Sequence, residues 1–414
     1  MNSDEMEEGQ GGSMKQSFFH SRSSFATAAR STAAVCAAGC LLASSAMAQG
    51  VDAAPPNGTI GYVLTNLFWS IYQSDGGKEE CPHGFNDGPR EQFEHLYPQG
   101  RGKYTVEDTQ LLLEAETWLP ERVANPIAAK LPFHEVQTKK GYGLNLDGKV
   151  GAEDFTDPLT GEQGIDNEAY RVLGCIIGFR GPDGVEYIYQ DRGITQDEFN
   201  RQLVELTDVD SLVNDDDVTI TIYRGMDRLM MDATAKVILP GGTQRIESRW
   251  GKRLIRQVKG RIVDGVLTSE PLDQVMIPWE NLGVPTHQLL RDFSLRMKLT
   301  PTSAQGLYGG YADVDNWYRY LIRNDSTHHL SNGQISGISL VRAAYAHADA
   351  YPDAQTGKNT AISVALDAKW TQVYIVHTEG EEAKNALRAE AQAERLAHGN
   401  PASTSEPKTR STTR

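Results

Sequence analysis

The stretch RLIRQVKGRIVDGVLTSE, residues 253–270, decides the fold class. Its apolar and polar residues alternate on both sides of Asp264-Gly265, a dipeptide typical of the two-residue turn in an antiparallel hairpin. Such alternation is expected of strands that have one buried face and one face in water. We therefore predict a pair of strands here, at the centre of a β-rich half of the chain.

Further strand-like stretches lie on either side of this hairpin. They are VTITIYRG (218–225), ATAKVIL (233–239), QVMIPWE (274–280), FSLRMKLTP (293–301) and an apolar stretch within 359–377. Turn residues such as Pro240-Gly241-Gly242 separate them. This pattern predicts a predominantly antiparallel β-sandwich or open barrel over residues 208–378.

Helices are expected before and around this β-rich part, so the fold class is α+β with a mixed N-terminal region, residues 49–207. A strand over 60–72 should bring Trp69 into a core, and Asp166 is placed as the N-cap of a core helix. Other expected helices cover 89–96, 105–118, 195–206, 313–322, 337–350 and 381–398. The last of these lies in a peripheral tail, residues 379–414.

The first 48 residues have the pattern of a signal peptide. Lys15, Arg22 and Arg30 precede a run of small and apolar residues that ends in Ala46-Met47-Ala48, a typical cleavage site. The sequence thus predicts export to the periplasm or beyond. Lipid attachment at Cys40 after an alternative cleavage is a second interpretation.

The charge balance argues against two classes of partner. Three basic and four acidic residues fall in the leader, which leaves 37 Lys and Arg against 51 Asp and Glu, a net charge of −14. Nucleic acid and anionic lipid both require a basic footprint. No second apolar run approaches membrane-spanning length, so we expect no transmembrane span in the mature chain.

Two cysteines follow the leader, Cys81 and Cys175. In an oxidising compartment such a pair is expected to form a disulfide, with two buried free thiols as the alternative. Cys-x-x-Cys spacing is absent, which disfavours a cysteine metal site.

The segment GLNLDGKVGAED, residues 143–154, resembles the calcium loop of EF-hand and dockerin modules. The resemblance places ligands at Asn145, Asp147, the backbone carbonyl of Lys149 and Asp154, with Gly148 at the sharp turn. It implies Ca²⁺ as a cofactor, although Gly143 and Gly151 stand where the family has ligands. An Asp147-Gly148 hairpin turn explains the same residues without metal.

Catalytic motifs are few. His-Glu-x-x-His, Gly-x-Ser-x-Gly and the phosphate-binding glycine loops are absent, which disfavours zinc proteases, serine esterases and nucleotide-dependent enzymes. Asp313 and Asp315, beside Trp317 and Tyr318, suggest a carboxylate pair on a sugar-binding platform. Helix capping by the two carboxylates and burial of the two aromatic residues is the competing interpretation.

A basic segment, residues 245–261, interrupts the acidic chain. Arg249, Arg253, Arg256 and Lys259 within it form a candidate patch for an anionic ligand. The wet face of a strand pair accounts for the same residues.

Taken together, these patterns predict an exported, non-catalytic binding or structural protein with a glycan or another envelope component as partner, and with calcium as a stabilising ion. The alternative is a secreted, carboxylate-dependent hydrolase that acts on a saccharide or a similar polymer. The oligomeric state is left open.

Overall fold

The computed structural model describes residues 54–86, 94, 98–99, 132–181, 184–195, 201–247, 254–281, 284–317 and 337–377. These residues all belong to one unit, Gln49–Arg414. The predicted signal peptide, the C-terminal tail and the helices expected at 89–96, 105–118 and 381–398 lie outside the described residues. None of the described helices is long and apolar enough to cross a membrane.

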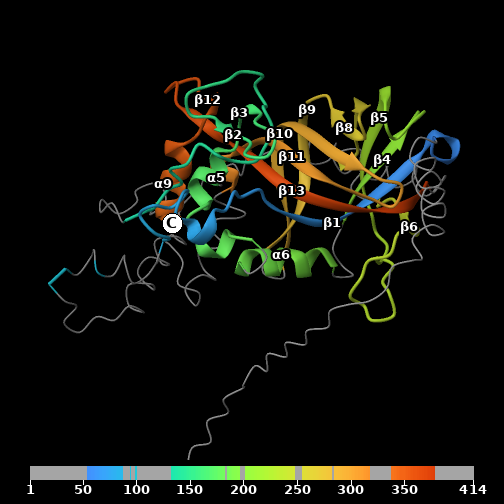
Figure 1. Ribbon diagram of the computed structural model, residues 1–414, viewed down its shortest axis with the longest axis horizontal. Helices are drawn as coiled ribbons and strands as arrows, with labels where there is room; N and C mark the ends of the chain where they lie inside the picture. The colour runs from blue at the N-terminus through green and yellow to red at the C-terminus, as the bar shows by residue number, and fades with distance from the viewer. Residues whose placement is uncertain are drawn as a thin grey trace, which may run out of the picture. The chain divides into compact units, whose positions relative to one another are not determined.

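The protein is mostly β, and its main sheet is antiparallel and closes into an eight-stranded barrel (Figure 1). The barrel strands, in spatial order, are β1 (Ile60–Trp69), β4 (Gln202–Thr207), β5 (Asp215–Arg224), β7 (Arg256–Val263), β8 (Val266–Ser269), β10 (Val284–Leu299), β11 (Ser303–Asp313) and β13 (Asn359–Val376). Three strands are attached to it: β6 (Gly242–Arg245) and β12 (Ala350–Pro352) pair with β13, and β9 (Leu272–Asn281) pairs with β10. A small separate sheet holds β2 (Phe155–Thr156) and β3 (Gln163–Ile165).

Pairing of β1 with β13 closes the barrel. The register runs from Gly61 opposite Val373 to Trp69 opposite Leu366, with one irregularity between Leu64 and Asn66. The expected antiparallel sheet is confirmed, but its expected form, a sandwich or an open barrel, is not what the chain adopts. β1 pairs over most of its length with residues 366–373 of β13, so neither strand is exposed as a sheet edge at this junction.

Inward-facing side chains of the strands fill the barrel. Trp370, Tyr308 and Tyr62 are fully buried, and the Tyr308 ring lies 5.3 Å from Trp370 and 4.9 Å from Phe293. At the other end of β1, Trp69 packs 5.2 Å from Trp279, as its predicted place in a core requires. Aromatic side chains therefore pack the interior around Trp370 and around Trp69, as expected for a barrel of this strand number.

Helices are few and short. They are α5 (Glu168–Leu173), α6 (Val185–Thr195), α7 (Val314–Trp317) and α9 (Gly337–Ala346), with 3-10 turns η1 (Pro56–Gly58), η2 (Asp75–Gly77) and η3 (Ile177–Phe179). Figure 1 shows α6 alongside the barrel near β1, where Asn66 Nδ2 donates to Asp191 Oδ1 at 2.9 Å and the Phe68 and Tyr187 rings meet edge to face.

The core helix α5 begins one residue later than predicted, because Asn167 is its N-cap. Asn167 Oδ1 accepts from the N–H of Tyr170, and the Asn167 amide also donates to the carbonyls of Ser70 and Tyr142. Asp166 faces the opposite way and accepts from the N–H of Leu146 at 2.6 Å. The buried stripe predicted for this helix is confirmed.

The predicted helix over 195–206 is wrong. Helix α6 ends at Thr195, and Leu203 and Leu206 lie on β4. Both faces of β4 are buried, Val204 and Leu206 inside the barrel and Leu203 in a cluster on its outer side. A strand buried on both faces loses the alternation that identifies a strand in sequence.

The predicted strand over 233–239 is also wrong. The Asp232 carboxylate accepts from the N–H groups of Lys236 and Val237 at 2.9 and 3.0 Å, and Ala235 adopts a left-handed conformation with φ of 53°. These bonds form a turn in place of a ladder. By contrast, the Asp264-Gly265 hairpin is confirmed, since φ is positive at both residues.

The predicted disulfide is confirmed, because Cys81 and Cys175 are bonded with their Cα atoms 5.7 Å apart. A buried ion pair supports it from one side. Glu80 is paired with Arg180, whose guanidinium also lies over the Phe85 ring at 4.7 Å. The bond thereby ties the segment after β1 to the end of α5.

A second ion cluster joins α5 to the end of α9. His347 lies 3.0 Å from Glu135 and 3.4 Å from Glu168, and Glu168 accepts two hydrogen bonds from Arg171. Burial lowers the pKa of His347, but its hydrogen bonds to Glu135 and Glu168 outweigh burial and raise the pKa to about 9. His347 is therefore cationic at neutral pH.

Removing the disulfide should destabilise the fold by about 4–5 kcal/mol, because the bond closes a long loop in the unfolded chain. We expect the urea midpoint to fall in the double variant Cys81→Ala/Cys175→Ala and in wild type treated with dithiothreitol. Dithiothreitol should leave the double variant unchanged. An unaltered wild-type midpoint under reduction would contradict the role assigned to the bond.

The His347 cluster should make stability depend on pH. A folded pKa near 9, above the ordinary value of 6.5, means that the stabilisation is fully present below pH 6.5 and is lost as pH rises through about 9. We expect His347→Gln to cost about 2–3 kcal/mol at pH 6 and little at pH 10, measured by urea unfolding. A cost that does not vary with pH would show that the charge of His347 contributes nothing.

Candidate functional site

A polar groove crosses the outer face of five neighbouring barrel strands. The register places five outward-facing residues in one row, from β13 through β1, β4 and β5 to β7: Val373, Gly61, Glu205, Thr221 and Gln257. A second row, two residues along the strands, holds Thr207, Thr219 and Lys259. Because side chains alternate across a strand, both rows face away from the core.

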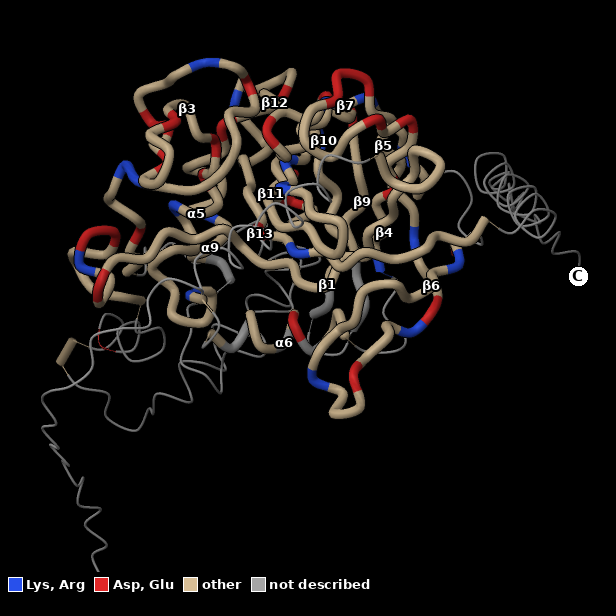
Figure 2. The backbone as a smooth tube through the Cα atoms, turned by 45° about the vertical axis from the view of Figure 1, so that its right-hand side comes forward, with Lys and Arg blue, Asp and Glu red and all other residues tan. Residues whose placement is uncertain are grey.

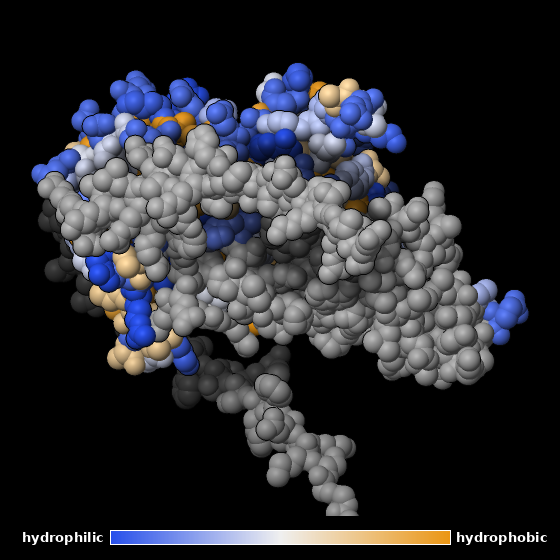
Figure 3. Space-filling view, turned by 180° about the vertical axis from the view of Figure 1, so that it is seen from behind, coloured by the Kyte–Doolittle hydropathy of each residue, from blue (hydrophilic) through white to orange (hydrophobic). Residues whose placement is uncertain are grey.

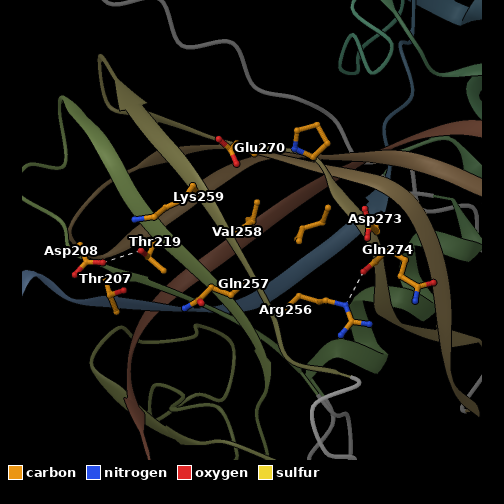
Figure 4. A pocket seen from close by; sticks show the side chains of 12 residues that line it. Thr207, Asp208, Thr219, Arg256, Gln257, Val258, Lys259, Glu270, Asp273 and Gln274 are labelled. Atoms are coloured by element: carbon orange, nitrogen blue, oxygen red, sulfur yellow. Dashed lines mark hydrogen bonds between the residues drawn. The ribbon is translucent and has the colours of Figure 1, made fainter.

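Two hollows make up this groove, and they share Thr207 and Gln257. The first, of about 820 Å³, lies over β13, β1 and β4 and is bordered by the segment 54–61. The second, of about 690 Å³, lies over β5 and β7 and reaches β9 (Figure 4). We call the two together the outer groove.

A carboxylate and an imidazole meet on the wall of the first hollow. Glu205 is buried, and both of its oxygens lie within 3.1 Å of Nε2 of His377, whose side chain is 44% exposed. The His377 ring stands edge-on to Tyr223 at 5.7 Å. Three residues before His377, the Tyr374 side chain is 61% exposed and also borders this hollow.

Charges of both signs line the second hollow, and several are already paired. Thr219 donates to Asp208 at 2.9 Å (Figure 4). Lys259 lies 2.7 Å from Asp217. Arg256 Nε donates to the carbonyl of Gln274 on β9 at 3.1 Å. The lining thus offers donors and acceptors together in place of one strong charge.

The predicted anionic-ligand patch is described only in part, since Arg249 and Arg253 lie outside the described residues. Arg256 and Lys259 are both in the outer groove, but each is engaged, Arg256 with backbone carbonyls and Lys259 with Asp217. Figure 2 shows acidic positions gathered at the nearby turn end of β5 and β7. In the described half of the patch, a carboxylate therefore pairs with Lys259 and backbone carbonyls accept from Arg256.

The two predicted catalytic carboxylates take part in local contacts. Asp313 accepts from the N–H of Asn316 at 3.0 Å, which is helix-capping geometry at the start of α7, and it lies 3.6 Å from Arg291. Asp315 accepts from the hydroxyl of Tyr345 at 2.7 Å. Trp317 is buried. Neither Asp313 nor Asp315 lines the outer groove.

The calcium-type loop is organised by its own hydrogen bonds. Asn145 Oδ1 accepts the N–H three residues on at 2.7 Å, and Asp147 Oδ1 accepts the N–H of Lys149 at 2.8 Å. The carbonyl of Lys149 accepts from Asn145 Nδ2, and Asp154 accepts from a nearby glycine N–H. Lys149 Nζ lies 3.1 Å from Asp147.

These contacts are those of the hairpin-turn interpretation and account for the conformation of the loop without an ion, while calcium binding stays a prediction. A bound Ca²⁺ needs six to eight oxygens directed at one point. Across the described ranges of the chain, no group of three or more His, Cys, Asp or Glu side chains is arranged to hold a metal ion. Burial, together with the carboxylates of Asp147 and Asp154, raises the pKa of the adjacent Asp166 to about 6, although N–H groups of the loop donate to it and act in the opposite direction.

Sequence patterns did not point to Glu205 or His377. The two are 172 residues apart, and Glu205 lies in a segment with a helical appearance. One signal was available: a carboxylate within QLVELT, among residues that must be buried, needs a partner.

Comparison of the chain with protein-family models, with curated proteins and with solved structures finds no match. The fold and the site therefore define only a class, a largely antiparallel closed barrel with an external polar groove.

Calcium should have no effect on the stability of the protein. Because turn N–H groups and Lys149 already satisfy the loop carboxylates, we expect the same melting temperature in EDTA and in millimolar Ca²⁺. Magnesium serves as the control for ionic effects. A rise that is specific to calcium and disappears in Asp147→Ala would restore the ion to the loop.

Proposed function

We propose that this protein is an exported, non-catalytic binding protein that holds a polar chain molecule, a glycan, in the outer groove. The continuity of the two hollows through Thr207 and Gln257 is the observation that supports this proposal. A groove that crosses five strands suits an extended ligand, whereas compact small-molecule sites are mostly apolar cavities.

The chemistry of the lining favours a glycan among polar polymers. Hydroxyl, amide and carboxylate groups alternate over short distances, which matches the closely spaced hydroxyls of a sugar chain. Tyr374 offers an exposed aromatic face at one border. The second hollow has three carboxylates against two cations, Arg256 and Lys259, and this balance disfavours a polyanion.

The surface elsewhere agrees with a polar ligand. On the face that Figure 3 shows, the described atoms are largely hydrophilic, with hydrophobic residues in smaller separate areas. Large apolar patches are typical of permanent protein interfaces. Export rests on the leader sequence of residues 1–48 and is compatible with the Cys81–Cys175 bond.

One observation favours a second candidate function, hydrolysis of a saccharide. Glu205 and His377 form an acid–base pair that borders the groove, and such a pair can move a proton to or from a bound substrate. The binding function requires only that Glu205 accept hydrogen bonds. The two functions differ in whether the bound glycan is turned over.

A glycan array probed with the mature protein tests the proposal. We expect binding of at least one glycan class, weakened about tenfold or more in Gln257→Ala and in Tyr374→Ala. Gln355→Ala and Tyr345→Ala are matched controls, because both side chains are exposed and lie outside the outer groove. Equal losses in variants and controls, or no binding, would contradict the proposal.

The same glycans should be assayed for cleavage. Turnover that is abolished in Glu205→Gln would establish the hydrolase instead, with catalysis in the groove. Turnover that persists in Glu205→Gln but is lost in Asp313→Asn or Asp315→Asn would move catalysis to α7.

A further inference from the structure

Inside the barrel, a buried arginine has no carboxylate partner among the residues that the structure describes. Arg224 is 1% exposed and shares the inward face of β5 with Ile220 and Ile222. Its Nη2 donates to the carbonyl of Met276 on β9, while Nε and Nη1 have no partner among the described residues. Burial lowers the pKa of Arg224 to about 10, so the side chain is still cationic at neutral pH.

Next to it, a chain of hydrogen bonds orients Gln202. Gln202 stands directly opposite Arg224 across the β4–β5 ladder. The indole N–H of Trp370 can only donate, so the Tyr308 hydroxyl accepts from it and donates its own proton to Gln202 Oε1. This arrangement fixes the amide orientation and leaves Gln202 Nε2 as a buried donor without a described partner.

A second amide faces inward from β10. Gln288 is 4% exposed and stands opposite Ile277 on β9. Ile277 directly follows Met276, whose carbonyl accepts from Arg224. Neither Nε2 nor Oε1 of Gln288 has a partner within the described chain. On the neighbouring position, burial and the charge of Arg224 lower the pKa of His287 to about 4, so this imidazole is neutral and adds no second cation.

The described part of the interior therefore has an excess of donors. Four nitrogen atoms lack acceptors there, two on Arg224 and one on each of Gln202 and Gln288. Against them stand one free oxygen on Gln288 and the unpartnered Nε2 of the neutral His287, which donates or accepts according to its tautomer. Leaving a buried guanidinium without a counter-charge is costly, and native proteins pair such groups or bind a ligand with them.

We infer that the barrel interior binds a compact oxyanion, a carboxylate or phosphate group, with Arg224 as the anchoring cation and Gln202 and Gln288 as amide donors. A planar guanidinium with two free N–H directions matches two oxygens of such a group. The ligand itself, or the acidic end of a larger molecule, supplies the missing negative charge.

The wall beside this cluster has a seam between β7 and β9. Strand β9 is not paired with β7. In place of backbone hydrogen bonds between strands, Arg256 donates to the carbonyl of Gln274, and Arg224 donates to the carbonyl of Met276. Arg256 and Val258, which share the inward face of β7, line the second hollow of the outer groove at this seam. An anion entering there meets Arg256 first and Arg224 next.

Isothermal titration of the dialysed mature protein with acetate, phosphate and sulfate tests the inference, with chloride at matched ionic strength as the baseline. We expect saturable binding of at least one oxyanion, and the preferred probe distinguishes a carboxylate ligand from a phosphate. Arg224→Gln should weaken this binding at least tenfold. Gln288→Met, which preserves volume, should weaken it severalfold and serves if Arg224→Gln does not fold.

Arg256→Gln is the matched control. Arg256 also donates to a carbonyl of β9, that of Gln274, two residues before the carbonyl that Arg224 binds. Equal weakening in Arg256→Gln and Arg224→Gln would place the anion at the seam and overturn the interior site. Absence of saturable binding in wild type would overturn it outright.

A purely structural clamp between Arg224 and Met276 predicts lower stability of Arg224→Gln in every buffer, with no anion-dependent difference from wild type. Glycan binding in the outer groove should be unaffected by Arg224→Gln.

Discussion

Pairing of β1 with β13 is the constraint on which the rest of the molecule depends. It joins the first described strand to the last, so the sheet has no free edge at this point and the inward side chains must fill a closed volume. The register puts Tyr62 opposite Gln372 and Leu64 opposite Trp370. It therefore brings Tyr62, Leu64 and Trp370 together in the core of the barrel. The same register brings outward-facing residues from both ends of the chain onto one continuous surface.

Gly61 shows how tight this junction is. A Cβ atom on Gly61 would lie 2.8 Å from the carbonyl oxygen of Val373 and 2.8 Å from Cγ1 of Ile375. The missing side chain lets the end of β13 lie flat against β1, and His377 just beyond it can then reach Glu205 on β4. The outer groove is thus a consequence of closure, and no single segment of the chain encodes it.

Local signals in the sequence predicted the local parts of the fold. The Asp264-Gly265 hairpin, the strand at β13, the Cys81–Cys175 bond and the buried stripe of α5 all rest on short-range patterns or on a single available partner. Prediction failed where tertiary contacts determine the outcome. Strand β4 is covered on both faces, and the Asp166 carboxylate was engaged by backbone amides of another loop, so that Asn167 became the cap.

The candidate sites follow the same division. Residues chosen by spacing, such as Asp147 and Asp313, belong to turns and helix ends, because the patterns that single them out are also the patterns of turn and cap chemistry. Groove residues come from five strands whose alignment depends on register, which sequence alone does not specify. Among the groove residues, only Arg256 and Lys259 were predicted from the sequence, because of their charge.

Alternation along β4 and β5 separates two chemistries by the thickness of one sheet. Glu205 and Thr221 face outward into the groove, while Gln202 and Arg224, three residues away on the same strands, face inward. An odd spacing along a strand reverses the face, so the buried carboxylate and the buried guanidinium cannot neutralise each other through the wall. Each must be compensated on its own side: Glu205 has His377, and one Arg224 donor has the Met276 carbonyl. The remaining Arg224 donors, Nε and Nη1, have no acceptor among the described residues. An unpaired buried charge opposes folding. An acceptor from outside the chain would pair these donors with the fewest changes to the fold.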